Sequence, residues 1–498
     1  RMKRQPIHAE ARNGVSNGIS NGTSNGTSNG TSNGSANGVK NGTTNGVMNG
    51  AHKKMPQVEV AAEGGLASTI NKTLMPIVLI PFCPNLILLL WYTAVHCDGS
   101  FMELGRRLME QGVVKGISDI WLSVNFGSTV ITSVIFGYML FALVLMIVLP
   151  GPRAEGPVTP KGNVPVYKDN GFYCYLVTVV AFAVLTVLLK QRGLTPTIVY
   201  DRFDEFLVTM TIISMAFCAL LQFKGYYFPS TTDSGSTGYF IFDYYWGTEL
   251  YPRIFGIDVK VFTNCRFGMT VWPLLCLLFA VKSYELYGFV DSMWVSCFLQ
   301  MAYFTKFFWW ESGYMRTIDI MVDRAGFYIC WGCLVYVPGL YASVSLYLVN
   351  HPVRLGPGLS LALLVTGLLA IAINYWADHQ KQIVRNTNGQ CTIWGKAPEV
   401  IRAKYRLETG EMRESLLLVS GFWGVGRHFH YVPELLLALC WTLPAGLVNI
   451  LPYSYFIFLF ILLTHRTFRD DVKCGSKYTT YWKQYCERVP YKMIPGIF

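Results

Sequence analysis

The chain has 498 residues, of which 52% are hydrophobic and only 14% are charged, and its formal net charge is +11. A soluble domain usually has about a quarter charged residues, so this composition argues against a set of soluble domains. No basic run or nucleic-acid-binding module accompanies the positive charge, which excludes a nucleic-acid partner. Apolar runs recur along the chain instead. We therefore expect one all-α, polytopic membrane domain, whose basic loops account for the charge.

Residues 1–72 differ from the rest, because their core is an Asn-Gly repeat with almost no apolar side chains. Such a segment cannot bury a core, so we expect a disordered cytosolic tail. Several N-G-T and N-G-S triplets match the glycosylation sequon. The basic start RMKR and the pair Lys53 and Lys54 nevertheless favour the cytosolic side. The membrane domain is expected to occupy residues 73–498.

About ten segments after the tail are apolar enough to cross a bilayer, which takes about 20 residues in a helix. The expected spans are 74–95, 125–149, 171–190, 205–222, 268–287, 291–310, 326–348, 357–377, 432–447 and 449–465. The last two share one apolar run that Pro444 interrupts, which predicts a tight hairpin. Lys and Arg are abundant in the loop 378–431 and after residue 465. Cytoplasmic loops carry such an excess, so both segments and both termini are expected in the cytosol.

The apolar stretch richest in ionisable residues is CFLQMAYFTKFFWWESGYMRTIDIMVDRAGFY, residues 297–328. Tyr303, Trp310 and Tyr314 fall on one face of a helix. Glu311 and further Arg and Asp residues follow near its end. Ionisable side chains in membrane segments are costly and mark functional sites, which predicts a polar wall on an apolar pocket. The alternative is a set of interfacial aromatics with intrahelical Arg–Asp pairs.

A second polar region follows the eighth expected span. Lys381 and Arg385 lie one helical turn apart and suit a phosphate group. They equally suit the solvated end of a membrane helix, where basic residues contact lipid headgroups. The segment GFWGVG at 421–426 does not fit a dinucleotide-binding loop, because no βαβ unit surrounds it. His428 and His430 lack further ligands at suitable spacing, so no metal site is expected.

From residue 158 to the end, the chain resembles the membrane sterol reductases, and among them the Δ7-sterol reductases. The resemblance rests on TNGQCTIWGKAP (387–398), SGFWGVGRHFHYVPE (420–434), HRTFRDDVKCGSKY (465–478) and VPYKMIPGIF (489–498). The Δ14-sterol reductases typically have R-H-P-N-Y where this chain has RHFHY at 427–431. They also tend to lack the N-G-x-C-x-I-W-G pattern found here at 388–395. Both differences favour the Δ7 group.

The resemblance implies an enzyme of sterol biosynthesis in the endoplasmic reticulum membrane, which uses NADPH to reduce the C7=C8 bond of a 5,7-diene sterol. The cofactor would lie in the C-terminal part, about 378–498, open to the cytosol. Lys381 and Arg385 would bind the ribose 2′-phosphate. The other implied cofactor-binding residues are Leu418, Trp423, His430, Tyr431, Asp470, Cys474, Gly475, Ser476, Lys477, Tyr478 and Tyr485. The expected partners are a sterol substrate and membrane lipid, and association with other sterol-biosynthesis enzymes is left open.

The implied reaction dictates what the site must contain. An unactivated alkene must be protonated at one carbon before the other can accept hydride, so the site needs an acid and a dry cavity. We expect Tyr303 to donate the proton and Asp470 to be its electrostatic partner or relay, with Tyr314 and Glu311 in support. Asp470 could instead pair with Arg466, one helical turn earlier.

The sequence alone is also compatible with three other functions. A C14=C15 sterol reductase would differ in substrate only. A membrane methyltransferase of the isoprenylcysteine type shares a C-terminal R-H-x-x-Y plus acidic pattern and binds S-adenosylmethionine, but eight expected spans upstream weigh against it. A non-enzymatic sterol-binding protein would keep the membrane fold without the chemistry.

Overall fold

The computed structural model describes residues 70–498, so the expected tail, 1–72, lies almost entirely outside the described part. Within residues 70–498 the chain is mainly helical, and its strands form three two-stranded antiparallel sheets. The prediction of an all-α polytopic membrane protein is confirmed.

The first half of the described chain contains four of the long apolar helical stretches, together with several short helices. In chain order they are η1 (Ile70–Leu74), α2 (Met75–His96), α3 (Phe101–Gln111), α4 (Val113–Ser123), α5 (Thr129–Val148), α6 (Gly171–Gln191), α7 (Ile198–Asp201), α8 (Phe203–Tyr227) and α9 (Phe240–Trp246). Two small sheets lie between them, β1 (Arg153–Glu155) with β2 (Val166–Lys168), and β3 (Arg253–Ile254) with β4 (Ile257–Asp258).

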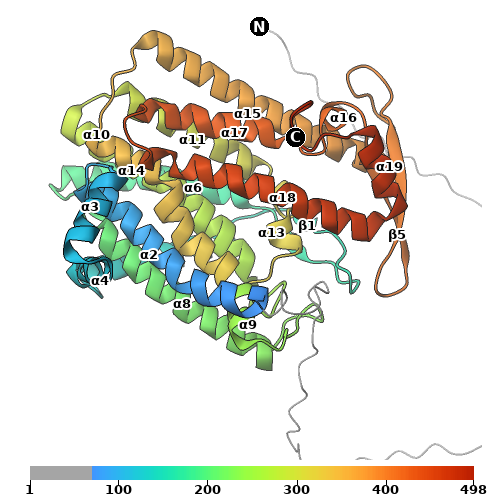
Figure 1. Cartoon of the computed structure of the whole chain (residues 1–498), viewed down its shortest axis with the longest axis horizontal. Coiled ribbons are helices and arrows are strands. Elements are labelled where there is room, and N and C mark those ends of the chain that lie inside the picture. The colour runs from blue at the N-terminus through green and yellow to red at the C-terminus, as the bar shows by residue number, and fades with distance from the viewer. Residues whose placement is uncertain (1–69) are drawn as a thin grey trace, which may run out of the picture. The chain divides into compact units, whose positions relative to one another are not determined.

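The second half supplies the remaining helices and the longest strands. They are η2 (Val261–Gly268), α10 (Met269–Tyr287), α11 (Asp291–Trp309), α12 (Glu311–Tyr314), α13 (Ile318–Met321), η3 (Phe327–Tyr341), α14 (Ser343–Asn350), α15 (Pro357–Asn386), β5 (Val400–Arg406), β6 (Met412–Leu418), α16 (Phe422–Val425), α17 (Tyr431–Thr442), η4 (Leu443–Ala445), η5 (Leu451–Tyr453), α18 (Ser454–Tyr478) and α19 (Thr480–Arg488). Figure 1 shows β5, α16 and α19 together at one end of the long helices.

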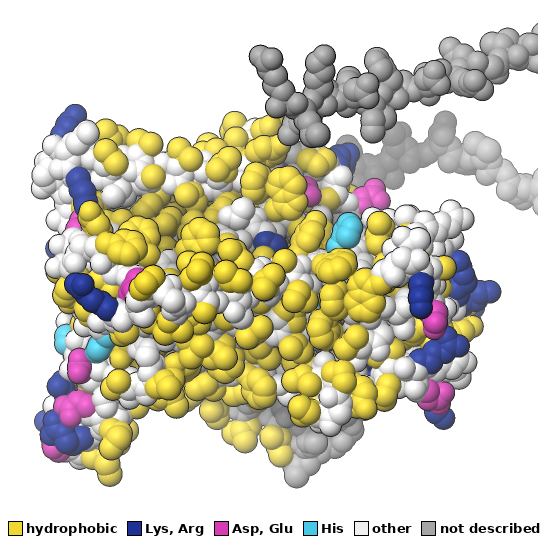
Figure 2. All heavy atoms as spheres, turned by 90° about the horizontal axis from the view of Figure 1, so that it is seen from above, with side chains coloured by type: hydrophobic (Ala, Val, Ile, Leu, Met, Phe, Trp, Pro, Cys, Tyr) yellow, Lys and Arg dark blue, Asp and Glu magenta, His cyan; other side chains and the backbone are white. Residues whose placement is uncertain are grey.

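Seven helical stretches of the described chain are long and apolar enough to cross a membrane, and each coincides with an expected span. They are Lys72–His96, Thr129–Val148, Gly171–Gln191, Phe203–Tyr227, Val261–Tyr287, Phe327–Asn350 and Pro357–Asn386. The other three expected spans are the helices α11, α17 and α18, of which α17 is short and the other two contain more polar residues. Figure 2 shows hydrophobic side chains over the middle of one face and charged ones toward its two ends.

Burial separates central from peripheral helices. The most apolar part of Val261–Tyr287 and of Phe327–Asn350 is 78% buried, whereas that of Thr129–Val148 and of Gly171–Gln191 is only 17% buried. Apolar side chains on the peripheral helices therefore face outward, as expected where lipid replaces water. The protein's own core lies around η2, η3 and α10.

The segment rich in ionisable residues is not one continuous helix. Trp310 leaves helical geometry with φ −127° and ψ 48°, so α11 ends at Trp309 and the single turn α12 follows. The prediction of one helical face through Tyr303, Trp310 and Tyr314 is therefore wrong. The three side chains nevertheless line the same cavity.

The predicted hairpin at Pro444 is confirmed. Helix α17 ends at Thr442, Pro444 lies in the 3₁₀ turn η4, and α18 begins at Ser454. Helices α17 and α18 then pack together, and α17 also packs along α15. Helix α15 approaches α11 closely at Gly367, where a Cβ atom would come within 2.6 Å of Leu299 Cδ2. These contacts hold α11, α15, α17 and α18 around one space.

Strands β5 and β6 form a hairpin that the sequence analysis did not predict. Val400 pairs with Leu418 and Arg406 with Met412 across its length. Ile401 and Leu417 are buried against side chains of α18 and α19, including Trp482. The hairpin thereby fixes the C-terminal helices beside the end of α15.

Candidate functional site

A cavity of about 980 Å³ lies among η3, α11, α15, α17 and α18, with further wall residues from α2 and the β5–β6 hairpin. This volume is at the upper end of the range of about 300–1,000 Å³ that ligand pockets usually span. One part of its wall is apolar and includes Leu79, Phe82, Leu86, Tyr336, Val337, Phe458 and Leu462. Another part is basic and comes from the C-terminal halves of α15 and α18.

The basic part contains four cationic side chains, Lys381, Arg385, Lys473 and Lys477. Among the described residues none of the four forms an ion pair with a carboxylate. Lys381 instead lies over the ring of Trp423, 4.0 Å from its centroid, and Lys477 lies 4.1 Å from that of Tyr405. Burial lowers the pKa of Lys473. Positive charge without a protein partner favours an anionic ligand, such as a phosphate, at this end.

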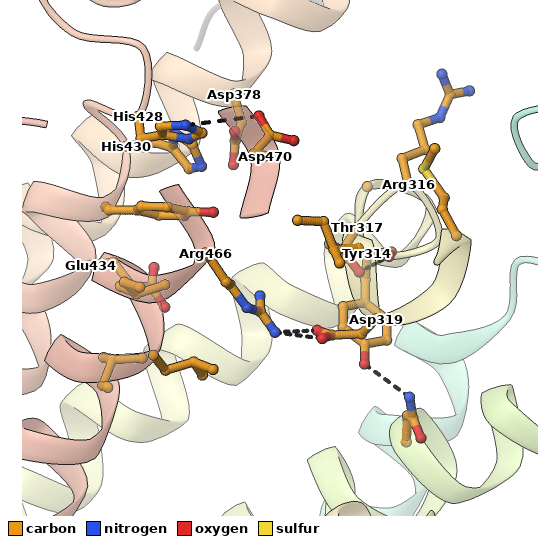
Figure 3. A pocket seen from close by; sticks show the side chains of 18 of the residues that line it. Tyr314, Arg316, Thr317, Asp319, Asp378, His428, His430, Glu434, Arg466 and Asp470 are labelled. Atoms are coloured by element: carbon orange, nitrogen blue, oxygen red, sulfur yellow. Dashed lines mark hydrogen bonds and ion pairs between the residues drawn. The ribbon is translucent and has the colours of Figure 1, made fainter. Parts of the chain in front are cut away.

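Two carboxylates of α18 lie near these cations but serve different contacts. Asp471 pairs with Arg427 at 3.6 Å and with Lys492 at 3.1 Å. Asp470 faces His428, with 3.8 Å between Oδ2 and Nε2, as Figure 3 shows. The alternative pairing of Asp470 with Arg466 is wrong, because Arg466 contacts both oxygens of Asp319 at 2.5 and 2.6 Å.

Two histidines, His428 and His430, also line the cavity. Within the described chain, Nε2 of His428 and Nδ1 of His430 are buried without a hydrogen-bond partner. Burial lowers the pKa of both imidazoles to about 3, so both are neutral at pH 7. Tyr431 stacks on His428, with 5.3 Å between ring centroids, and Trp423 lies 5.0 Å from His430. The result is an uncharged wall of rings beside the cations.

Tyr303 of α11 lines the cavity and packs against the hydrophobic core. Its ring packs against Trp272 and Trp441, at centroid distances of 6.4 and 5.7 Å. The acidic side chain that acts most strongly on its hydroxyl is Glu434 of α17. Tyr314 is held separately, because its hydroxyl accepts a hydrogen bond of 3.1 Å from the Asn264 amide. Tyr303 therefore has a neighbouring carboxyl group, but that group is not Asp470.

The charged residues after α12 form ion pairs with a distant helix. Asp319 binds Arg466 and Asp323 binds Arg469, both from α18, with shortest distances of 2.5 Å. The alternative of intrahelical Arg–Asp pairs is thus wrong for these carboxylates. Both pairs join the segment 311–326 to α18. Figure 3 shows the pair of Asp319 and Arg466, whose residues both line the cavity.

The structure brings most of the predicted site residues together. The cavity wall includes Tyr303, Tyr314, Lys381, Arg385, Leu418, Trp423, His430, Tyr431, Asp470, Cys474, Lys477, Tyr478 and Tyr485. Glu311, Gly475 and Ser476 are not on this wall. Glu311 is buried in an ion pair with Arg266, whose guanidinium also donates to Asn170 at 2.9 Å. Ser476 is exposed on α18 and donates to the carbonyl of Val472.

Several wall residues were not among the predicted site residues, including Glu434, Lys306 and Lys473. Lys306 donates to Asn374 at 2.6 Å, and Asn374 donates to the carbonyl of His430 at 2.9 Å. A signal was available for Glu434, since it stands directly before the apolar run LLLALCW. A carboxyl group in a membrane segment is a site candidate by the same rule that singled out residues 297–328.

These features define a polytopic membrane protein with a cavity whose wall combines cations, uncharged rings and apolar side chains. Residues 80–498 match the ergosterol biosynthesis ERG4/ERG24 family, and the chain belongs to this family of sterol reductases. It is therefore an oxidoreductase of sterol biosynthesis, which removes the methyltransferase and the non-enzymatic alternatives.

Curated relatives agree with this assignment. The chain is 51% identical over 423 residues to a 7-dehydrocholesterol reductase of Arabidopsis thaliana, covering 84% of this chain and 96% of the relative. It is 36% identical over 437 residues to a 7-dehydrocholesterol reductase of Xenopus laevis, covering 85% and 91%. A Delta(14)-sterol reductase of Methylotuvimicrobium alcaliphilum is 35% identical over 355 residues, covering 71% and 80%.

Proposed function

We propose that the protein reduces the C7=C8 double bond of a 5,7-diene sterol with NADPH, in the endoplasmic reticulum membrane and with the basic end of the cavity facing the cytosol. The observation that carries the proposal is one cavity whose wall contains Tyr303, apolar side chains and cations that form no ion pair among the described residues. The identity of 51% to a relative named 7-dehydrocholesterol reductase, against 35% to one named Delta(14)-sterol reductase, favours the C7=C8 bond.

The basic end fits the phosphates of NADPH. Lys381 and Arg385 project from adjacent turns of α15, so both can contact one phosphate group. We assign them to the 2′-phosphate, and Lys473 and Lys477 to other phosphate oxygens. Because these cations have no carboxylate partner among the described residues, an incoming phosphate replaces no protein ion pair.

The neutral rings next to the cations fit the remainder of the cofactor. NADPH, when bound, supplies the hydride. Trp423 and Tyr431 offer flat faces for its rings, and His428 and His430 carry ring nitrogens that lack a hydrogen-bond partner among the described residues. Both imidazoles are uncharged at neutral pH, because burial lowers their pKa to about 3. They can therefore form hydrogen bonds without placing a positive charge beside the ring that donates hydride. Asp470, which faces His428, belongs to this end of the site.

The apolar part of the cavity fits the sterol. Side chains of α2, η3 and α18 surround it, so the rings of the sterol would be enclosed without water. A dry wall matters because water would compete with hydride for the protonated alkene. Of these helices, α2 and η3 belong to stretches long and apolar enough to cross a membrane, from which a sterol can enter.

Tyr303 is the proton donor in this proposal. Its hydroxyl proton would pass to one carbon of the alkene, and Glu434 would return a proton to the phenolate that results. Glu434 suits this role because it is the carboxyl group that acts most strongly on the Tyr303 hydroxyl and because it also lines the cavity. Tyr314 has a second hydroxyl on the same wall, while Glu311 is engaged with Arg266 and is left as a structural residue.

The test is a turnover assay on the purified full chain in lipid. The protein is incubated with NADPH and either a 5,7-diene or an 8,14-diene sterol, and the products are identified by mass spectrometry and NMR. We expect loss of the 5,7-diene absorbance and a product that is saturated at C7–C8. Turnover of the 8,14-diene alone would assign the protein to the C14=C15 bond instead.

A further inference from the structure

The turn within the I-W-G motif presents an exposed tryptophan on the outside of the cavity wall. Ile393 and Lys396 exchange both backbone hydrogen bonds, at 2.8 and 3.1 Å. Trp394 and Gly395 at the tip have φ values of +50° and +78°. The left-handed region is rare for a bulky residue. Trp394 is nevertheless held there with 53% of its surface exposed. A strained residue with an exposed indole indicates a role at the surface.

Trp394 belongs to a cluster that we call the outer aromatic patch, made of Trp376, Trp394, Phe422 and Phe429. The Phe422 ring contacts both tryptophans edge-on, with centroid distances of 5.0 Å to Trp394 and 5.4 Å to Trp376. Phe429 stacks on Phe422 at 5.2 Å. Trp376 is 49% exposed. The patch therefore joins the I-W-G turn to α15 through the half-buried ring of Phe422, with an exposed tryptophan on either side.

The position of the patch follows from α15. This helix spans Pro357–Asn386 and is long and apolar enough to cross a membrane. Its outward face is exposed at every third or fourth residue, at Leu361, Val365, Leu368, Ala372 and Trp376. The next exposed residue on this face is His379, and the charged residues Lys381 and Arg385 follow. The apolar face thus ends at Trp376, which marks the edge of the hydrocarbon region.

The surroundings in the figures agree with this position. Helix α15 is the uppermost long helix in Figure 1, and α16 lies beside its C-terminal end. Figure 2 views the molecule from above and shows hydrophobic side chains across the middle, with charged side chains at the ends. Tryptophan is enriched where membrane and water meet, because its ring is apolar and its N–H is polar.

We propose that the outer aromatic patch inserts into the interfacial region of the phospholipid bilayer, at the membrane face toward which the basic end of the cavity opens. The patch continues the lipid-facing surface of α15, so a phospholipid interface is the partner that fits. Insertion would also hold the wall of the cavity in place. Ile393 packs with Leu418 and Trp423 in one buried cluster, and the Phe422 N–H donates to Gln380 on α15 at 3.0 Å.

The experiment places a fluorescent label at Trp394→Cys in the full chain, reconstituted in phosphatidylcholine nanodiscs. The signal of the equally treated unsubstituted chain is subtracted to remove labelling of native cysteines. Leu368→Cys on the outward face of α15 serves as the lipid control. Met412→Cys serves as the water control, because Met412 is 60% exposed between the paired Glu411 and Arg413. Quenching is measured with a nitroxide lipid and with aqueous iodide.

We expect the label at 394 to be quenched by the nitroxide lipid as at 368, and to be shielded from iodide relative to 412. Quenching by iodide equal to that at 412, without quenching by the lipid, would overturn the proposal. Shielding from both quenchers would also overturn it, since the patch would then be covered by protein. If Trp394→Cys does not fold, Trp376→Cys tests the same patch with the same criteria.

Discussion

Replacement of Lys381 by alanine tests how the basic end of the cavity works. In the absence of cofactor, Lys381 has no carboxylate partner among the described residues and lies over Trp423 at 4.0 Å. Its removal therefore leaves no buried anion unpaired, and the fold should tolerate the change. What is lost is a charge-assisted contact to the 2′-phosphate, which NADPH has and NADH lacks.

The size of the effect follows from the contacts available. A hydrogen bond to a charged group contributes about 1.5–3 kcal/mol. Since about 1.4 kcal/mol corresponds to a factor of ten, Lys381→Ala should raise the KM for NADPH roughly 10- to 150-fold. Arg385 lines the same cavity, and among the described residues its side chain donates one long hydrogen bond, 3.5 Å to the Leu416 carbonyl. Arg385→Ala should therefore have an effect of similar size.

The assay compares steady-state kinetics with NADPH and NADH for wild type, Lys381→Ala and a matched control. Lys404→Ala is suitable as the control, because Lys404 is exposed on β5 and its removal changes the net charge equally. We expect KM for NADPH to rise in Lys381→Ala, KM for NADH to change little, and Lys404→Ala to behave as wild type. An equal rise for both cofactors would refute the assignment and would make Lys381 a residue of folding or lipid contact.

Three further changes probe other parts of the account. Tyr303→Phe should lower kcat by roughly 10²–10⁴-fold, the usual contribution of general acid catalysis, with the Kd for NADPH unchanged; near-normal turnover would reject Tyr303 as the donor. Glu311→Gln should lower stability by about 3–5 kcal/mol, because it breaks a buried ion pair; an unchanged unfolding midpoint would argue against a structural role. Burial lowers the pKa of His428 and His430 from 6.5 to about 3. At a pH between these two pKa values, the unfolded chain therefore binds protons that the folded chain does not. Stability should therefore fall as pH drops through this range, and less so in His428→Asn; an unfolding midpoint that is constant over the same range would contradict the burial of these imidazoles.

The membrane helices could be predicted because apolar composition over about 20 residues is a local property of the chain. Pro444 likewise marks its turn without any tertiary information. The break after Trp309 could not be read in this way, since Phe307 to Trp310 are all apolar and suit a helix as well as its end. The β5–β6 hairpin was predictable in part, because Ile401 and Ala403 alternate with charged residues as in a strand with one buried face. This pattern is too short and too polar to be recognised as a membrane span.

The site was harder to predict than the fold because its contacts join distant segments. The motifs pointed to Lys381, Trp423 and His430, which do share a wall. Charge partners were not predictable from spacing, since Asp319 pairs with Arg466, 147 residues away. For the same reason spacing did not indicate that Glu434, rather than Asp470, is the carboxyl group that acts most strongly on the Tyr303 hydroxyl.

The most direct test of the central claim follows the two hydrogens that the enzyme adds. The full chain in lipid is incubated with a 5,7-diene sterol and NADPH deuterated at the transferable position, and in parallel with unlabelled NADPH in D₂O. We predict that each reaction yields a product with one deuterium, at a different carbon of the former C7=C8 bond. A product with both hydrogens from solvent, or an intact C7=C8 bond in either reaction, would contradict the account.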